Sequence, residues 1–513
     1  MTVTIQYPLY NQFLIQANDL VPVTLLCGFL GSGKTTLLKH ILEAKHGEED
    51  FNCAVIVNDM AELNIDKSLI DQTSLIQSDD AMVGMQNGCI CCTLQSDLCD
   101  QIVKLTQMKK FNYILIEASG ISEPHEIAPL FDVHPHYHMD HADEEDHDHD
   151  TPQLGEVARL DTCVTLIDSA DFYNNLGSMK AFDDCGLDGT IAELMMDQVE
   201  FANVVILNKG DLVNEEQQHD LTEKVELLNP NARIVKTIQS KINVLEILNT
   251  RLYKDKDEFW VSSAKRADAA AAEEKKEEGK SVPEACTARF DIKSFVYRAR
   301  RPFHPGRLND LVVGPYFSIP IFPSCEHEGG EEAAQKNKIQ FKNLQEEALE
   351  KQNKRKEKMG EVLRSKGFFW IATSHDIIAG WQQAGNVIRI ASESPWLCLL
   401  PEIWTGTASE AHVLKDFKKP DGEDYEYKDR RQEIVFIGHG MKRDVIQELL
   451  DECLLNDEEM ALGPKKWKEN WEEINKFKLV LDESDDEDDD EGDEQEEPES
   501  DDESKSKRMK MNE

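Results

Sequence analysis

The nine residues GFLGSGKTT, Gly28 to Thr36, decide the fold of this chain. They match the pattern G-x-x-x-x-G-K-[ST]. The apolar run Val23–Cys27 before them is typical of a buried strand, and Leu37–Leu42 after them has the spacing of a helix. A glycine turn can imitate the pattern by itself. The strand before it and the helix after it favour a phosphate-binding P-loop.

A P-loop predicts a nucleoside triphosphate ligand. Backbone N–H groups at the start of the helix bind phosphate oxygens, and the helix dipole favours the anion. We expect Lys34 to reach the β- and γ-phosphates and the Thr35 hydroxyl to hold Mg²⁺. The predicted nucleotide contacts in this stretch are Gly28, Gly31, Ser32, Gly33, Lys34, Thr35 and Thr36.

Further apolar runs follow, and each leads into a polar residue. The alternation of strands with helices predicts an α/β P-loop NTPase domain with a mostly parallel sheet. Ligands of such sheets bind at the carboxyl ends of the strands, where these polar residues lie. The runs are Cys53–Val57 before Asn58, Tyr113–Ile116 before Glu117, Thr162–Ile167 before Asp168 and Asn203–Leu207 before Asn208.

The last of these runs leads into Asn208-Lys209-Gly210-Asp211. The Asp211 carboxylate can accept two hydrogen bonds from the Watson–Crick edge of guanine, and adenine offers no such donor pair. These four residues also suit an ordinary turn. Their position after a buried strand and downstream of a P-loop favours guanine, and so predicts GTP bound by Asn208, Lys209 and Asp211.

Glu117-Ala118-Ser119-Gly120 also follows a strand. An acid there suits the shell of Mg²⁺, and the glycine suits a backbone close to the γ-phosphate; the alternative is a turn at the end of a strand. We predict Lys34, Thr35 and Glu117 as the catalytic residues.

Three cysteines lie within the four residues Cys89-Ile90-Cys91-Cys92. Thiolates gathered in this way are typical of a soft-metal site, suited to Zn²⁺ or Cu(I). Buried or redox cysteines are the alternative. We predict Cys89, Cys91 and Cys92 as metal ligands and Cys99 as an ordinary helix residue.

Two other stretches have a metal-related interpretation. Residues 134–149 contain six histidines among carboxylates, which suits weak binding of several metal ions or a solvated polar loop. Asn58–Asp66 follows a strand where a GTPase carries its first switch. Glu62 and Asp66 are candidates there for sensing Mg²⁺ or the cargo metal, and a capped loop is the alternative.

Composition excludes several classes of protein. The net charge of −44 opposes nucleic-acid binding, because phosphates would be repelled. No apolar run is long enough to span a bilayer, and the first residues lack the basic and apolar regions of a secretory signal. Twelve cysteines fit a reducing compartment, so we expect a cytoplasmic protein.

Five hundred and thirteen residues predict more than one domain. We expect a GTPase domain at 1–262, a linker at 263–288, a smaller α/β or α+β domain at 289–481 and a disordered acidic tail at 482–513. A charged insertion at 326–366, either an exposed helix or disorder, interrupts the second domain. In that domain we expect a strand and a helix from Pro305, two strands within 367–390, and a strand followed by a helix that buries Val445, Leu449, Leu450 and Cys453.

Together these motifs resemble the CobW-like P-loop GTPases, which are related to the nickel chaperones UreG and HypB. The resemblance covers Val21 to about Trp260, and the region from Phe290 to about Leu481 resembles the CobW C-terminal domain; the insertion and the tail lie outside the pattern. At 58–63 the sequence NDMAEL departs from the more usual NEFGE. Glu62 therefore matches the family pattern better than Asp59 does.

The resemblance implies a GTP-hydrolysing metallochaperone whose three cysteines hold cargo Zn²⁺, or Co²⁺, near the nucleotide. Its expected partners are GTP, Mg²⁺, the transition metal and an apo-metalloprotein client; a homodimer is the oligomer considered, and neither nucleic acid nor membrane is expected. A metal store or sensor with incidental GTPase activity is the first alternative, and a metal-insertion factor for cofactor synthesis is the second.

Overall fold

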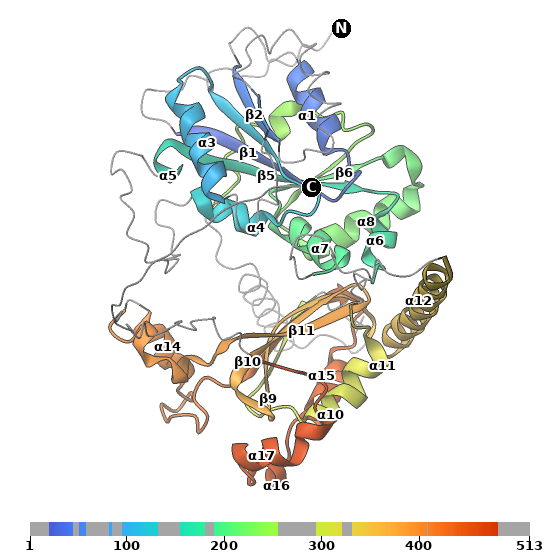
Figure 1. The fold of residues 1–513 in the computed structure, drawn as a ribbon, viewed down its shortest axis with the longest axis vertical. Helices are drawn as coiled ribbons and strands as arrows, with labels where there is room; N and C mark the ends of the chain where they lie inside the picture. The colour runs from blue at the N-terminus through green and yellow to red at the C-terminus, as the bar shows by residue number, and fades with distance from the viewer. Residues whose placement is uncertain are drawn as a thin grey trace, which may run out of the picture.

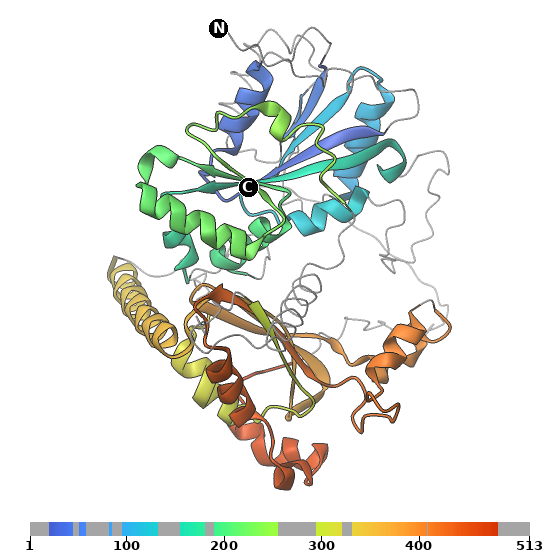
Figure 2. The same cartoon turned by 180° about the vertical axis from the view of Figure 1, so that it is seen from behind.

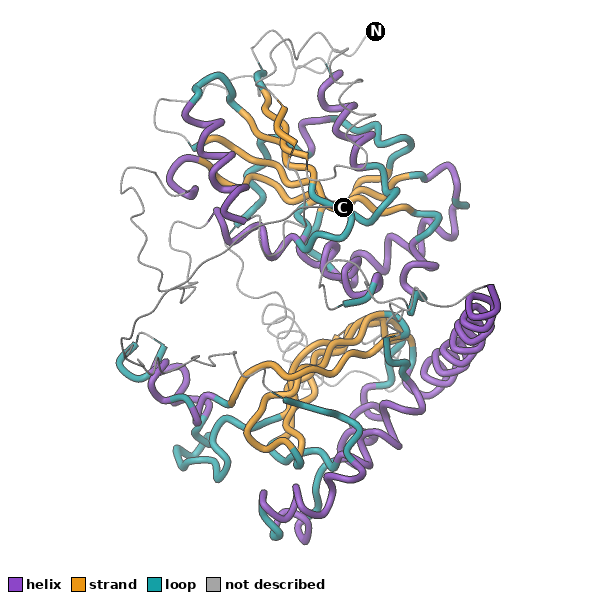
Figure 3. Tube along the Cα trace, viewed as in Figure 1, coloured by secondary structure: helices purple, strands orange, loops and turns teal. Residues whose placement is uncertain are grey.

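The computed structural model describes residues 20–44, 51–57, 82–84, 95–131, 154–179, 189–254, 294–320, 331–407 and 409–480. None of the helices within these ranges has the length and apolar character needed to cross a membrane. The strands form two separate sheets, one in each half of the chain (Figure 3).

The first sheet has seven strands, all parallel, in the order β3-β2-β4-β1-β5-β6-β7. This confirms the predicted P-loop fold. The strands β3 and β7 were not expected from the sequence, because each is short and neither is a strongly apolar run. The strands are β1 Val21–Cys27, β2 Cys53–Val57, β3 Met82–Gly84, β4 Tyr113–Glu117, β5 Ala158–Asp168, β6 Val204–Asn208 and β7 Arg233–Lys236.

Helices cover both faces of this sheet, since alternate residues of each strand point to opposite sides. One face packs on α1, with Leu37 and Ile41 in its core, and the other packs on α3 and α7, through residues such as Leu98 and Val199. The helices are α1 Lys34–Glu43, α3 Gln95–Gln107, α4 Pro124–Ile127, α5 Leu154–Val157, α6 Phe172–Leu176, α7 Ile191–Phe201 and α8 Glu215–Leu228, with 3₁₀ turns at Ala128–Phe131, Gly210–Leu212 and Val244–Glu246.

The chain changes direction across the sheet at β1. From β1 it moves outward to β2 and β3, returns to β4, and then crosses to β5, β6 and β7 on the other side. Figure 1 shows β2 and β6 on opposite sides of β1. Ligands of open parallel sheets bind outside the carboxyl ends of the strands at such a switch point. The P-loop follows β1 and therefore lies at that place.

The second sheet has five strands in the order β11-β10-β9-β12-β8, each antiparallel to its neighbours. Its strands are β8 Ser294–Ala299, β9 Glu361–Ile371, β10 Ser374–Ala384, β11 Val387–Pro395 and β12 Gln432–His439. Its helices are α10 Pro305–Arg307, a π-helix at Leu308–Val313, α11 Gly314–Tyr316, α12 Glu331–Met359, α13 Pro401–Trp404, α14 Glu410–Asp416, α15 Arg443–Cys453, α16 Asp457–Met460 and α17 Pro464–Trp471, with 3₁₀ turns at Leu397–Leu399 and Glu472–Ile474.

Three predictions for this domain need correction. The stretch expected to hold two strands lies in three, because two tight turns separate β9, β10 and β11. Within the charged insertion, Glu331–Met359 form a helix, which was one of the two alternatives, but residues 361–366 already belong to β9, so the insertion was placed too far along the chain. Helix α15 buries Ile446, Leu450 and Cys453, so its buried face is rotated from the predicted one.

The two domains meet along an apolar contact. Ala384, Val435 and Ile437 of the second sheet share one buried cluster with Phe172 of α6 and residues of α7 and α8. Helices α6, α7 and α8 therefore lie between the two sheets, as the two opposite views show (Figure 1; Figure 2).

A buried carboxylate fixes the amino end of β5. Asp161 is 0% exposed and accepts hydrogen bonds from the backbone N–H groups of Thr250 and Arg251 at 2.7 and 3.0 Å. The Arg159 guanidinium donates to it at 2.6 Å, and the Tyr113 hydroxyl donates at 3.2 Å. Asp161 thus fastens the segment after β7 to the sheet.

We expect Asp161→Asn to lower the free energy of unfolding by about 3 kcal/mol or more, because an amide group would face N–H donors and leave Arg159 uncompensated. Urea denaturation followed by circular dichroism measures the loss. Asp457→Asn is the matched control: Asp457 pairs with Arg301 but is 88% exposed, so its loss should stay below about 0.5 kcal/mol. Equal losses in the two variants would contradict the anchoring role of Asp161.

Candidate nucleotide site

The P-loop requires glycine at two points of close backbone approach. Gly28 has φ 136°, and a Cβ there would lie 2.4 Å from the Leu166 carbonyl oxygen of β5. Gly33 has φ 107°, and a Cβ there would lie 2.4 Å from the Asn208 side-chain nitrogen. Any larger residue would push the loop away from β5 and β6, so this glycine pattern keeps the phosphate cradle tight.

Lys34 is folded over the loop. Its Nζ donates to the Gly28 carbonyl at 2.8 Å and to the Phe29 carbonyl at 3.5 Å, and the residue is 8% exposed. The ammonium group therefore lies inside the cradle, where phosphate oxygens would meet it. Its contact with the β- and γ-phosphates stays a prediction.

The structure brings Thr35 and Glu117 together. The Thr35 hydroxyl, in the first turn of α1, donates to a Glu117 carboxylate oxygen at 2.7 Å. Glu117 is the last residue of β4 and is 4% exposed. The backbone N–H of Ala118, which follows it, donates to the Leu26 carbonyl of β1 at 3.0 Å and so holds this strand end in place. A hydroxyl and a carboxylate that converge beside a phosphate cradle are the oxygen donors that Mg²⁺ prefers, so these residues fit that ion.

The side chain of Asn208 is buried and bonds to neighbouring loops of the protein, so it does not point outward to meet a base. Its side-chain nitrogen donates to the Ser32 carbonyl and to Ser240 Oγ, both at 2.9 Å. Its oxygen accepts from the Ser240 N–H at 2.9 Å and from the Thr237 hydroxyl at 3.1 Å. Asn208 therefore ties the P-loop to the loop after β7.

The other two residues of the predicted guanine motif lie beyond Asn208. Lys209 has φ 59°, and its Nζ donates to Asp168 at 2.6 Å. Asp211 lies in an exposed 3₁₀ turn, where its carboxylate makes no hydrogen bond to the residues that the structure describes. A carboxylate at this rim can accept hydrogen bonds from an arriving base.

Thr237 and Ser240 of this site were not expected from the sequence, and Asp168 was expected there only as the polar residue that ends a strand. Ser240 is 0% exposed, has φ 55°, and donates from its hydroxyl to the Gly33 carbonyl at 3.1 Å. The short strand Arg233–Lys236 before it is the signal that could have pointed to this loop, because its carboxyl end lies at the same edge of the sheet.

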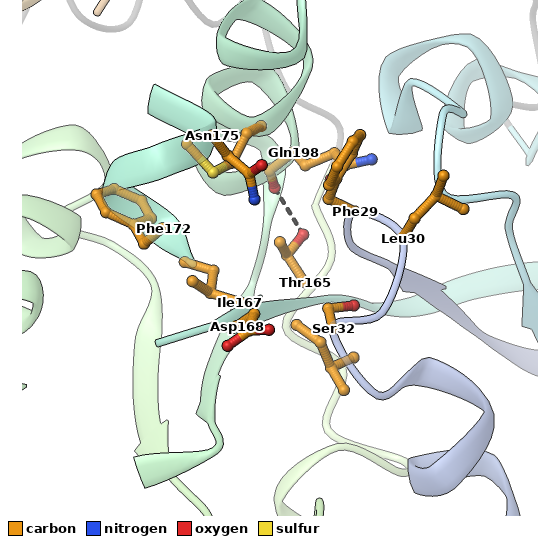
Figure 4. Close-up of a pocket in the computed structure, with 11 residues that line it drawn as sticks. Phe29, Leu30, Ser32, Thr165, Ile167, Asp168, Phe172, Asn175 and Gln198 are labelled. Carbon is orange, nitrogen blue, oxygen red and sulfur yellow. Dashed lines mark hydrogen bonds between the residues drawn. The ribbon is translucent and has the colours of Figure 1, made fainter. Parts of the chain in front are cut away.

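A cavity lies beside the P-loop (Figure 4). Phe29, Leu30 and Ser32 line it from the loop, β5 contributes Thr165 and Asp168, and α7 contributes Gln198. The Ser32 hydroxyl is buried and has no hydrogen-bond partner within the described part of the chain. A buried donor of this kind fits a ligand such as a phosphate or water at the loop.

Several predicted metal-binding residues lie outside the described residues. They are Glu62, Asp66, Cys89, Cys91, Cys92 and the histidines of 134–149. Within the described ranges no group of three His, Cys, Asp or Glu side chains could hold a metal ion. Cys99 lies on α3 as expected, and burial raises its pKa to about 11, which leaves a neutral thiol.

Two family models match the chain. The model described as CobW/HypB/UreG, nucleotide-binding domain, matches residues 22–236, and the cobalamin synthesis protein cobW C-terminal domain matches residues 339–454. The sequence analysis placed the charged insertion outside the family pattern. The second match begins inside α12, so part of the insertion belongs to that pattern.

Known proteins show the same relationship. The chain is 35% identical over 474 residues to the zinc-regulated GTPase metalloprotein activator 1 of Dictyostelium discoideum, covering 89% of this chain and 85% of that protein. It is 31% identical to the zinc chaperone CobW of Pseudomonas aeruginosa, over 38% of this chain and 50% of that protein.

Among solved structures, Zn(II)-bound YjiA GTPase from E. coli matches 85% of this chain and all of its own. The identity is 18% and the TM-score 0.33, too low to support a conclusion. The near full-length relative and the two family models agree with the P-loop geometry. This chain therefore belongs to the CobW/HypB/UreG family and is a P-loop GTPase.

Proposed function

We propose that this GTPase binds Zn²⁺ as cargo and transfers it to a client apo-metalloprotein, with GTP hydrolysis timing the release. The names of the zinc-regulated activator and of the zinc chaperone support zinc as the metal. Cysteine thiolates at 89, 91 and 92 would hold it, because soft sulfur ligands suit zinc.

The placement of β3 is the observation that carries this proposal. β3 ends at Gly84, at the carboxyl edge of the sheet, and α3 begins at Gln95. Cys89, Cys91 and Cys92 come between these two elements in the sequence and lie outside the described residues. The P-loop leaves β1 at the same edge as the end of β3. Three strand spacings separate β3 from β1, which corresponds to about 14 Å. The short distance between the ends of β3 and β1 supports a cargo site that responds to the γ-phosphate.

The reaction follows from the residues around the cradle. Mg²⁺, when bound through Thr35 and Glu117, would neutralise charge on the β- and γ-phosphates. Lys34 and the N–H groups at the start of α1 would stabilise the remaining negative charge while water attacks in line. Lys209 and Asp211 would hold the guanosine, and Asn208 would position the loop that they belong to.

A metal store or sensor is the rival function, and the histidines at 134–149 favour it. A store needs many weak sites and no coupling to the nucleotide. A metal-insertion factor for cofactor synthesis remains a special case of delivery, in which the client makes a cofactor.

Exchange of Asp211 for Asn should change the preferred base. The side-chain N–H of asparagine can donate to the 2-oxygen of xanthine. In guanine the same position carries an amino group, so two donors would face each other there. We expect Asp211→Asn to weaken GTP binding by about 1–3 kcal/mol and to improve binding of xanthosine triphosphate. Calorimetry with GTP, xanthosine triphosphate and ATP measures both changes; Asp171→Asn, which alters an acid outside the guanine site, is the control. Equal affinity of the unaltered protein for GTP and ATP would contradict the role given to Asp211.

The two metal-related regions should differ in affinity. Changing Cys89, Cys91 and Cys92 together to Ser should abolish the tight zinc site, since the hard hydroxyl replaces a soft thiolate. Deleting residues 134–149 should reduce only the number of weakly bound ions. Zinc titration against a competing chelator measures both, with Cys99→Ser as the matched control. Loss of the tight site in the deletion, with the cysteines intact, would place the cargo in the histidine segment and favour storage.

A further inference from the structure

Helix α7 carries a row of carboxylates toward the C-terminal domain. Glu193, Asp197 and Glu200 are spaced by four and three residues and so share one face of the helix. Asp197 lies 2.5 Å from an Arg364 nitrogen, and Glu200 lies 3.3 Å from Arg364 Nε. Arg389 approaches Glu193 at 3.4 Å.

These ion pairs are shielded from solvent. The Arg364 side chain is 1% exposed, that of Glu200 is 5% exposed and that of Asp197 is 15% exposed. Burial raises the pKa of Asp197, but Arg364 and Lys366 outweigh it, so the pKa lies below its ordinary value and the group is ionised. Breaking a shielded pair leaves an uncompensated charge, so these contacts fix the position of α7 more firmly than surface pairs would.

Gln198, which follows Asp197 on α7, points toward the loop after β4. Gln198 is 1% exposed, and its side-chain nitrogen donates to the Ser122 carbonyl at 3.1 Å and reaches the Gly120 carbonyl at 3.5 Å. The backbone carbonyl of Gln198 accepts from the Thr165 hydroxyl of β5 at 2.6 Å, the dashed contact in Figure 4. Gln198 thus holds the loop that follows the catalytic strand β4.

That loop in turn touches the P-loop. A Cβ at Gly120 would lie 2.5 Å from the Leu30 side chain and 2.9 Å from the Leu30 nitrogen. The loop begins after Glu117, which contacts Thr35, so its position sets two sides of the γ-phosphate site. Hydrolysis of a phosphate depends mainly on positioning and charge, so a small displacement here should slow the reaction.

The far end of the same loop meets the charge cluster. Burial and then Asp197 raise the pKa of Glu123 to about 7, while Lys366, Arg389 and Arg364 act in the opposite direction. The loop therefore contacts α7 through Gly120 and Ser122, and its last residue, Glu123, lies within the field of Asp197 and of the cations of the second sheet.

We propose that Gln198 is a positioning residue for GTP hydrolysis and that Arg364 of the C-terminal domain sets its place through α7. The C-terminal domain then controls the rate of GTP hydrolysis through one buried helix. This inference rests on the GTPase activity of the chain. A client that displaces the C-terminal sheet would change the turnover rate through the same contact.

The test is a double-mutant cycle on the full chain. Gln198→Met removes the amide donor at nearly constant volume, and Arg364→Gln removes the guanidinium. We expect each variant to lower kcat for GTP about tenfold and to leave KM within about threefold, because the loop acts on the transition state rather than on the base. The double variant should be little slower than either single one, since both act through one element.

Three controls keep the result specific. Arg298→Gln breaks an ion pair to Glu433 inside the C-terminal sheet and should leave kcat unchanged. Arg364→Lys keeps the cation and should recover most of the rate. The stoichiometry of GDP binding gives the fraction of folded protein, and Asp197→Asn replaces Arg364→Gln if that variant does not fold.

The outcomes separate two conclusions. No GTP turnover in the unaltered chain would contradict the GTPase activity itself. Normal turnover together with unchanged kcat in the Gln198 and Arg364 variants would overturn only the inference, as would fully additive losses, because independent effects would mean that α7 does not connect the two sites.

Discussion

The close approach of the P-loop to β5 and β6 is the constraint on which the rest of the structure depends. Gly28 and Gly33 allow contacts that any Cβ would block, one with the Leu166 backbone and one with the Asn208 side chain. Asn208 uses all of its hydrogen-bonding capacity to hold Ser32 and the Ser240 loop. Asn208 thus ties the P-loop to the loop that follows β7, and the parallel sheet places both at one edge.

The second domain is joined to this unit by more than a linker. An apolar cluster and a row of shielded ion pairs fasten α7, α6 and α8 against the antiparallel sheet. A mainly polar contact would allow the domains to move independently. Apolar burial combined with specific ion pairs favours one orientation of the two domains relative to each other. A structural change in one domain can therefore be transmitted to the other.

The local motifs of the nucleotide domain could be predicted from the sequence because each depends on neighbouring residues. The P-loop, the strand ending at Glu117 and Asn208–Asp211 all lie where the sequence places them. Contacts between distant segments could not be predicted. Arg364 and Asp197 are 167 residues apart, and neither stands out in composition or spacing. Ser240 was missed because the strand before it is short and weakly apolar, and because only the fold brings Ser240 to Gly33.

We propose that the nucleotide state sets the affinity of this chain for zinc. Linkage requires zinc to tighten GTP binding by the factor by which GTP tightens zinc binding, and such factors are commonly about fivefold to 150-fold. The decisive measurement is the zinc affinity of the full chain with Mg²⁺ and GDP and with Mg²⁺ and a non-hydrolysable GTP analogue, repeated in the triple Cys→Ser protein. A higher affinity in the GTP-analogue state, lost when the cysteines are replaced, is the predicted result. Identical zinc affinity in both nucleotide states would contradict the account, because hydrolysis could then drive no release.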